Sequence, residues 1–163
     1  MAERWAGLTL AGVCAVGALL AGLSSIAGAT PPPGTQFDVP KLERDMEECV
    51  AYAMPPAQVL AGWVNPTTGQ TLQWRCDSLR HMYVEQTNLH DPFVNVDAFV
   101  RCTDRIISCG PPHPATKPPY MALIYQYNGT SRRGYVIYHP ATSDSVTIYT
   151  DPDNDWAGCA NGR

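Results

Sequence analysis

Three side chains in the carboxyl-terminal third of the chain have types that suit phosphoryl chemistry. Arg132 and Arg133 are neighbours, and His139 follows in the same segment. If they converge in a pocket, a histidine can act as a general acid while a guanidinium stabilises negative charge on a phosphate or carboxylate. No glutamate follows Glu85, so this region has no glutamate to act as a base. These three residues are therefore kept as an alternative catalytic site.

Alternating aspartates near the carboxyl terminus suit a different chemistry. Asp151, Asp153 and Asp155 stand at every second position in Asp-Pro-Asp-Asn-Asp. Oxygen ligands alternate in this way in calcium loops, so the spacing predicts a calcium site. The alternative is an acidic surface turn that a disulfide at Cys159 holds in place.

The same stretch, residues 151–159, resembles the DxDxDGxxC sequence of the excalibur calcium-binding module of secreted bacterial proteins. The resemblance covers about nine residues and implies calcium as a ligand. Two positions differ from that module. Trp156 replaces the glycine that lets the loop turn sharply, and Ala160 stands where the module has a glutamate ligand.

Tyrosines are concentrated in the last third of the chain, which contains six of the eight. An exposed patch of rigid aromatic rings is a common means of holding a ligand or partner. We therefore predict a binding face on this part of the chain, with a sheet covered on both sides as the alternative. The predicted binding residues are Tyr125, Tyr127, Tyr135 and Tyr138.

The elements that must position these side chains begin with strands. Aromatic and β-branched residues predict strands over residues 120–127, 134–139 and 145–150. Asn128-Gly129 is a strong signal for a tight hairpin turn, and residues 141–145 supply a second turn. The three strands are expected to form an antiparallel meander.

Helices are predicted from apolar periodicity before this meander. Residues 66–69 give a turn signal, and the segment 58–64 before it is compatible with a strand. The predicted fold is α+β, with two or three helices packed on a three- to four-stranded antiparallel sheet. The predicted helices span residues 38–53, 72–83 and 91–109.

The cysteines favour disulfides over a metal site, because they are far apart and form no CxxC pair. Five cysteines lie beyond the amino-terminal segment. We expect four of them to form two disulfides and the fifth to be a buried, inert thiol. A helix over 91–109 would place Cys102 and Cys109 roughly 10 Å apart along its axis, too far to bond to each other. The candidates are Cys49, Cys76, Cys102, Cys109 and Cys159.

The amino terminus indicates export. Residues 1–29 carry a long uncharged run that ends in Ala27-Gly28-Ala29, as a secretory signal peptide does. Retention of this run as a membrane anchor is the alternative. A mobile proline-rich lead-in follows over residues 30–37, and a single domain over 38–163. We expect a secreted, extracellular or cell-envelope protein, with no membrane attachment once the signal is cleaved.

These observations favour a non-catalytic binding protein over an enzyme. The expected partner is an extracellular protein or small ligand, and no cofactor is expected apart from calcium. The formal net charge of −4 gives no support to a nucleic-acid partner. The alternative is a small secreted phosphodiesterase with His139, Arg132 and Arg133 near its active site. Its layout would be ribonuclease-like, because the helices precede an antiparallel meander.

Overall fold

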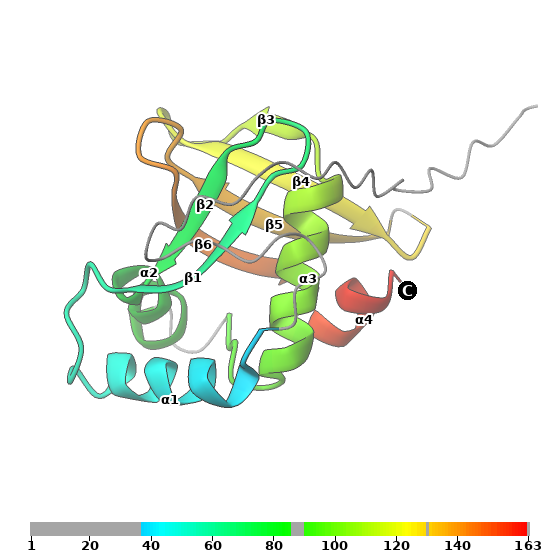
Figure 1. Cartoon of the computed structure of the whole chain (residues 1–163). Coiled ribbons are helices and arrows are strands. Elements are labelled where there is room, and N and C mark those ends of the chain that lie inside the picture. The colour runs from blue at the N-terminus through cyan, green and yellow to red at the C-terminus, as the bar shows by residue number, and fades with distance from the viewer. Residues whose placement is uncertain (1–36, 86–89, 130, 163) are drawn as a thin grey trace, which may run out of the picture.

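The computed structural model describes residues 37–85, 90–129 and 131–162, which form an α+β fold (Figure 1). The predicted signal peptide and nearly all of the predicted lead-in lie outside the described residues. The helices are α1 (Val39–Val50), α2 (Cys76–Arg80), the π-helix η1 (His81–Glu85), α3 (Val96–Cys109) and α4 (Trp156–Asn161). The strands are β1 (Val59–Val64), β2 (Thr71–Arg75), β3 (Pro112–Pro114), β4 (Met121–Tyr127), β5 (Arg132–Tyr138) and β6 (Asp144–Asp151).

One sheet contains all six described strands, in the order β1-β2-β6-β5-β4-β3. The predicted meander is confirmed, because β4, β5 and β6 pair antiparallel in sequence order. The hairpin turn predicted at Asn128-Gly129 is also confirmed, since it follows β4 and both residues have positive φ, but four positions rather than two separate the paired residues Tyr127 and Arg132. The sheet is nevertheless larger than predicted. It is also mixed, because β2 pairs parallel with β6 where Gln73 and Trp74 lie opposite Asp144 and Ser145.

The prediction of a helix over 72–83 is wrong at its start. Leu72 and Trp74 are buried while the residues between and beside them are half-buried, which is the two-residue alternation of a strand. The helical stretch begins only at Cys76. Before β2, the Asn65 side chain accepts hydrogen bonds from the backbone N–H groups of Thr67 and Thr68, and this turn returns the chain from β1.

Helix caps explain where the other two predicted helices begin. Asp38 caps α1, because its carboxylate accepts the Lys41 backbone N–H at 3.0 Å. The third helix begins later than predicted, at Val96, with Asn95 as its cap. Asp91 instead accepts the Phe93 N–H in a separate turn, so it closes a loop rather than starting the helix.

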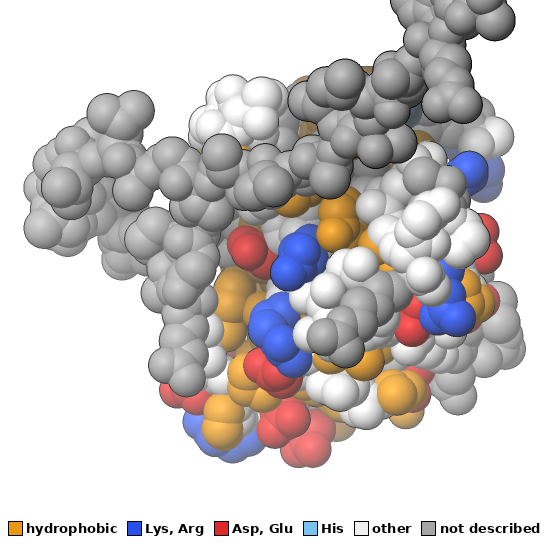
Figure 2. Space-filling model, turned by 90° about the vertical axis from the view of Figure 1, so that its right-hand side faces the viewer, with side chains coloured by type: hydrophobic (Ala, Val, Ile, Leu, Met, Phe, Trp, Pro, Cys, Tyr) orange, Lys and Arg blue, Asp and Glu red, His pale blue; other side chains and the backbone are white. Residues whose placement is uncertain are grey.

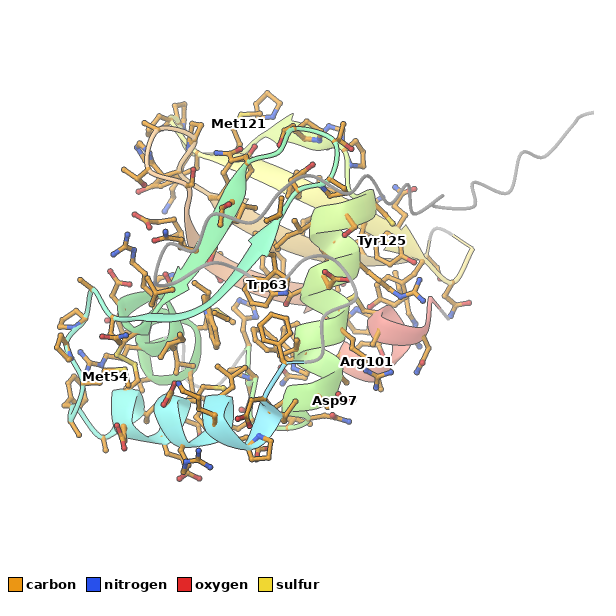
Figure 3. The ribbon with its side chains drawn as sticks, in the orientation of Figure 1. Met54, Trp63, Asp97, Arg101, Met121 and Tyr125 are labelled. Atoms are coloured by element: carbon orange, nitrogen blue, oxygen red, sulfur yellow. A yellow bond between two sulfur atoms is a disulfide. The ribbon has the colours of Figure 1, made fainter. Side chains whose placement is uncertain are left out.

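The core lies between α3 and one face of the sheet (Figure 1). A Cβ atom on Gly134 of β5 would lie 2.7 Å from Ile106 of α3, so glycine allows this close approach. A series of aromatic contacts runs from Trp74 through Phe99 to Trp156, with ring centroids 4.9 and 5.1 Å apart. The buried Trp63 side chain lies beside α3 (Figure 3). One face of the sheet is therefore covered by helices and forms the core with them.

Two disulfides hold helices together. Cys49–Cys76 joins α1 to α2, and Cys102–Cys159 joins α3 to α4. The prediction that Cys102 and Cys109 do not bond to each other is confirmed. The expectation of one leftover thiol is wrong, because Cys109 is also disulfide-bonded and no described cysteine is free.

Within residues 37–85, 90–129 and 131–162, no helix has the length and apolar character needed to cross a membrane.

Candidate functional site

The two faces of the β4–β5–β6 meander differ in what covers them. Side chains paired across neighbouring strands share a face, and successive residues alternate between faces. The helix face carries Val136 and Ile148, which are fully buried against the core. Side chains on the other face are half-buried or exposed, apart from Ala122. We call it the open face; it includes Ile124, Arg133, Tyr135, Ile137, Tyr149 and Asp151.

The four predicted binding tyrosines do not share a face. Tyr125, Tyr127 and Tyr138 lie on the helix face, and only Tyr135 lies on the open face. The rings of Tyr125 and Tyr127 stack with centroids 5.9 Å apart, and Tyr125 lies beside α3 (Figure 3). Tyr127 and Tyr138 are buried in the core. Three of the four therefore contribute to stability rather than to an exposed surface.

Three rings form a stacked column on the open face. Tyr135 of β5 lies directly opposite Tyr149 of β6, and their ring centroids are 4.5 Å apart with planes 9° from parallel. His90, from the loop before α3, stacks on Tyr149 at 5.0 Å. We call His90, Tyr149 and Tyr135 the aromatic column.

Polar groups of both charges surround the aromatic column. At one end, Arg133 lies two residues before Tyr135 on the same face, and its interaction with the Tyr135 hydroxyl raises the pKa of the guanidinium. At the other end, the His90 Nδ1 atom lies 3.1 Å from a carboxylate oxygen of Asp153. Asp151 lies opposite Arg133 on the neighbouring strand. The column is thus bordered by both hydrogen-bond donors and acceptors.

Partial burial favours the neutral form of Tyr149. The pKa of Tyr149 is raised first by desolvation, and then by the charges of Tyr135, Asp151 and Asp153. Its hydroxyl is a hydrogen-bond donor at neutral pH, as that of any neutral tyrosine is. The open face consequently presents phenol, imidazole, guanidinium and carboxylate groups within a few residues of one another.

Arg132 lies on the helix face, away from Arg133. Its guanidinium donates to a carboxylate oxygen of Asp155 at 2.6 Å, and the Tyr127 hydroxyl donates to the same oxygen at 3.0 Å. Burial and the Asp155 hydrogen bond raise the pKa of Tyr127. Asp155 directly precedes α4, so this group joins the β4–β5 hairpin to the carboxyl-terminal helix.

The residues of the alternative catalytic site are not brought together. His139 follows the carboxyl end of β5, whereas Arg132 and Arg133 stand at its start. At about 3.3 Å per residue, Arg133 and His139 are roughly 20 Å apart along the chain. His139 instead contacts Tyr120, with ring centroids 5.7 Å apart. The pocket that phosphoryl transfer would need is not formed by these side chains.

The three aspartates of the predicted calcium site point to different partners. Asp155 is bonded to Arg132 and Tyr127, Asp153 contacts His90, and Asp151 lies on the open face. In the described part of the chain, no group of three or more His, Cys, Asp or Glu side chains is placed to hold a metal ion. Trp156 is buried and donates its indole N–H to the Asp91 carbonyl oxygen, so it anchors this segment to the core.

Two members of the aromatic column were missed in the sequence. The alternation of β6 could have identified Tyr149, because it lies directly opposite Tyr135 in the predicted meander. No local signal identifies His90. It is far from Tyr149 in the sequence and reaches the open face from a loop, where Asn154 accepts the neighbouring Asp91 backbone N–H.

Lys and Arg side chains lie next to Asp and Glu side chains on the side of the molecule that carries α3 and α4 (Figure 2). The ion pairs of α3 and α4 include Arg101 with Asp97 and Arg132 with Asp155. Interspersed charges of this kind give no extended positive surface for a polyanion in the part of this side that the structure describes.

High pH is expected to destabilise the fold through buried tyrosines. The pKa values of Tyr127, Tyr138 and Tyr149 are raised, in each case chiefly by burial. Above about pH 10 the unfolded chain loses these protons before the folded chain does. The free energy of unfolding should then fall by up to about 1.4 kcal/mol per pH unit for each tyrosine, while below pH 10 the contribution is fully present. Urea unfolding at a series of alkaline pH values measures this slope.

A variant pair checks the source of the slope. Tyr127→Phe should give a shallower fall above pH 10, because one of the three phenols is removed. Tyr52→Phe, at a ring that is 67% exposed, should leave the slope as it is in the unmodified chain. An unchanged slope in Tyr127→Phe would contradict the assignment.

No known protein family, characterised protein or solved structure matches this chain.

Proposed function

We propose that this chain is an extracellular, non-catalytic binding protein that holds its ligand on the open face. The observation that carries the proposal is the aromatic column, in which three rings from two strands and a loop stack at the surface. Rigid aromatic side chains lose little conformational entropy on binding and dominate the energy of many interfaces. The His90 Nδ1 atom lies 3.1 Å from a carboxylate oxygen of Asp153, and Arg133 lies beside Tyr135 on the same face.

An exterior location agrees with the disulfides. Cys49–Cys76 and Cys102–Cys159 are bonds of a kind that persists in oxidising compartments and is rare in the cytosol. The uncharged amino-terminal run supplies the route of export in this proposal.

The alternative, a secreted phosphodiesterase, has less support. Its histidine and arginines lie at opposite ends of β5, and His139 contacts a tyrosine rather than a group that it could activate. A binding protein requires no such convergence of catalytic groups.

The proposal predicts that binding depends on the aromatic column. A panel of immobilised extracellular ligands, containing neutral and acidic oligosaccharides and peptides, would be probed with the unmodified chain and with a Tyr135→Ala, Tyr149→Ala double variant. Removing both rings should weaken binding by about 30-fold or more, as for interface residues that dominate an affinity. Surface plasmon resonance gives the dissociation constants.

The matched control removes an aromatic ring elsewhere. Tyr52 is highly exposed, lies outside the open face and has a φ of 60°, so Tyr52→Asn keeps a residue that tolerates this backbone conformation. This variant should bind as the unmodified chain does. Equal binding by all three proteins, or no binding to any member of the panel, would contradict the proposed function.

A further inference from the structure

The aromatic column presents ring edges and hydroxyl groups to a ligand, rather than broad ring faces. Tyr135 and Tyr149 are nearly parallel at 4.5 Å, so the rings overlap and each covers one face of the other. His90 covers the second face of Tyr149 at 5.0 Å. The free face of Tyr135 is directed along the sheet toward its cross-strand neighbour Ile124. A ligand above the column therefore meets hydrogen-bonding groups first.

The charges around the column are of both signs and leave a small negative excess. Arg133 supplies one positive charge, while Asp151 and Asp153 supply two negative charges beside a histidine. The carboxylates oppose a polyanion, and the guanidinium opposes a strongly cationic ligand. Arg133, Asp151 and Gln126 all carry planar polar groups that can make two hydrogen bonds at once. This combination suits a neutral ligand rich in hydroxyl groups.

An aliphatic surface continues from the column along the sheet. Ile124 and Ile137 lie beside Tyr135 on the open face, and the pair of Tyr120 and His139 stands at the far end. The four steps from Tyr135 to His139 span about 13 Å of extended strand. The surface is therefore long enough for several linked units of a chain molecule, with polar groups at one end and apolar C–H contacts along its length.

We propose that the open face binds a neutral oligosaccharide chain, laid from the aromatic column toward Tyr120 and His139. The inference rests on the proposed function and names its ligand class. Hydroxyl groups of the sugar would bond to Arg133, Asp151 and the tyrosine hydroxyls. The apolar C–H faces of the sugar rings would lie against the ring edge of Tyr135 and the two isoleucines.

Affinity for neutral polysaccharides, measured with its dependence on salt, tests this ligand class. The probes are a soluble α-glucan, a β-glucan, a mannan and an arabinogalactan, with a sulfated polysaccharide and a lysine-rich peptide as charged comparisons. At least one neutral polymer should bind, with an affinity that changes less than about twofold between low and high salt. Arg133→Ala should weaken that binding about tenfold, as should Tyr135→Ala, whereas Tyr52→Asn should not change it.

The outcomes separate this inference from the proposed function. Binding of a charged probe that weakens steeply with salt and depends on Tyr135 would overturn the sugar assignment and leave the binding face in place. Binding of a neutral polysaccharide that is unchanged in Tyr135→Ala and Arg133→Ala would overturn the assignment of the site. Failure of every probe to bind, charged or neutral, would overturn both.

Discussion

Removing the Cys102–Cys159 disulfide by the double substitution Cys102→Ala, Cys159→Ala is expected to lower the free energy of unfolding by about 4 kcal/mol. The bridge joins residues with a sequence separation of 57. The chain-entropy relation for a loop of this length gives about 4 kcal/mol at 25 °C, because the bridge restricts the unfolded chain. Domains of this size have about 5 to 15 kcal/mol in total, so the loss is a large fraction of the stability. The melting temperature should fall by more than about 10 °C.

The loss should be accompanied by a local effect at α4. This helix has six residues, which is too short to be stable in isolation. The disulfide to α3, the buried Trp156 ring and the Asp155 carboxylate hold it against the rest of the domain. Without the bridge, the amide protons of α4 should exchange faster with solvent than those of β5. Hydrogen exchange measured by mass spectrometry resolves the two segments.

The second disulfide provides the matched control. Cys49→Ala, Cys76→Ala opens a loop with a separation of 27, for which the same relation gives about 3.5 kcal/mol. Global stability should therefore fall by a similar amount, but the exchange of α4 relative to β5 should not change. A stability within about 1 kcal/mol of the unmodified chain after loss of Cys102–Cys159 would show that native packing alone holds α4.

The carboxyl-terminal meander could be predicted because its signals are local. Positive φ at Asn128 and Gly129 is a property of those two residues, and the flanking strands alternate over short distances. The parallel contact between β2 and β6 has no such signal. It joins Gln73 to Asp144, which are far apart in the sequence, through only two residue pairs. The short β2 was predicted as part of a helix, because Cys76 and Leu79, which have helical spacing, follow directly after Leu72 and Trp74.

The binding face was only partly predictable, for reasons of alternation and distance. Tyr135 and Tyr138 are three residues apart on one strand, so they must point to opposite faces, and this could have been recognised from the sequence. Tyr149 follows from the same alternation on β6. His90 does not, because its contact with Tyr149 depends on the course of the loop before α3. Of the four tyrosines predicted to bind a ligand, only Tyr135 belongs to the aromatic column, whose other members are Tyr149 and His90.

Arg80 was also missed, and its replacement is expected to have an effect nearly as large as loss of a disulfide. Its side chain is 8% exposed. The guanidinium donates to the carbonyl oxygens of Cys49 and Met54, each at 2.8 Å, and lies 4.2 Å from the Tyr52 ring centroid. It thereby satisfies carbonyl groups at the end of α1 and in the segment that follows, where no further helical turn exists to do so.

Arg80→Met should lower the free energy of unfolding by about 3 kcal/mol. Methionine keeps much of the apolar stem but donates no hydrogen bond, so the Met54 carbonyl oxygen loses its charged donor. The Cys49 carbonyl oxygen keeps the Tyr52 backbone N–H as a donor, at 3.0 Å, which limits the cost. Urea unfolding measures the change, and the exchange of amide protons in the last turn of α1 should increase.

Two further variants distinguish directed hydrogen bonding from charge alone. Arg101→Met removes a guanidinium from an exposed ion pair with Asp97, so it should cost less than about 1 kcal/mol. Arg80→Lys keeps the positive charge, but a single ammonium group cannot reproduce the planar arrangement of donors that reaches both carbonyl oxygens. Its stability should therefore fall between those of Arg80→Met and the unmodified chain. An Arg80→Lys variant as stable as the unmodified chain would contradict this explanation. A positive charge near the end of α1 would then be sufficient for the stability, and the paired hydrogen bonds would not be its source.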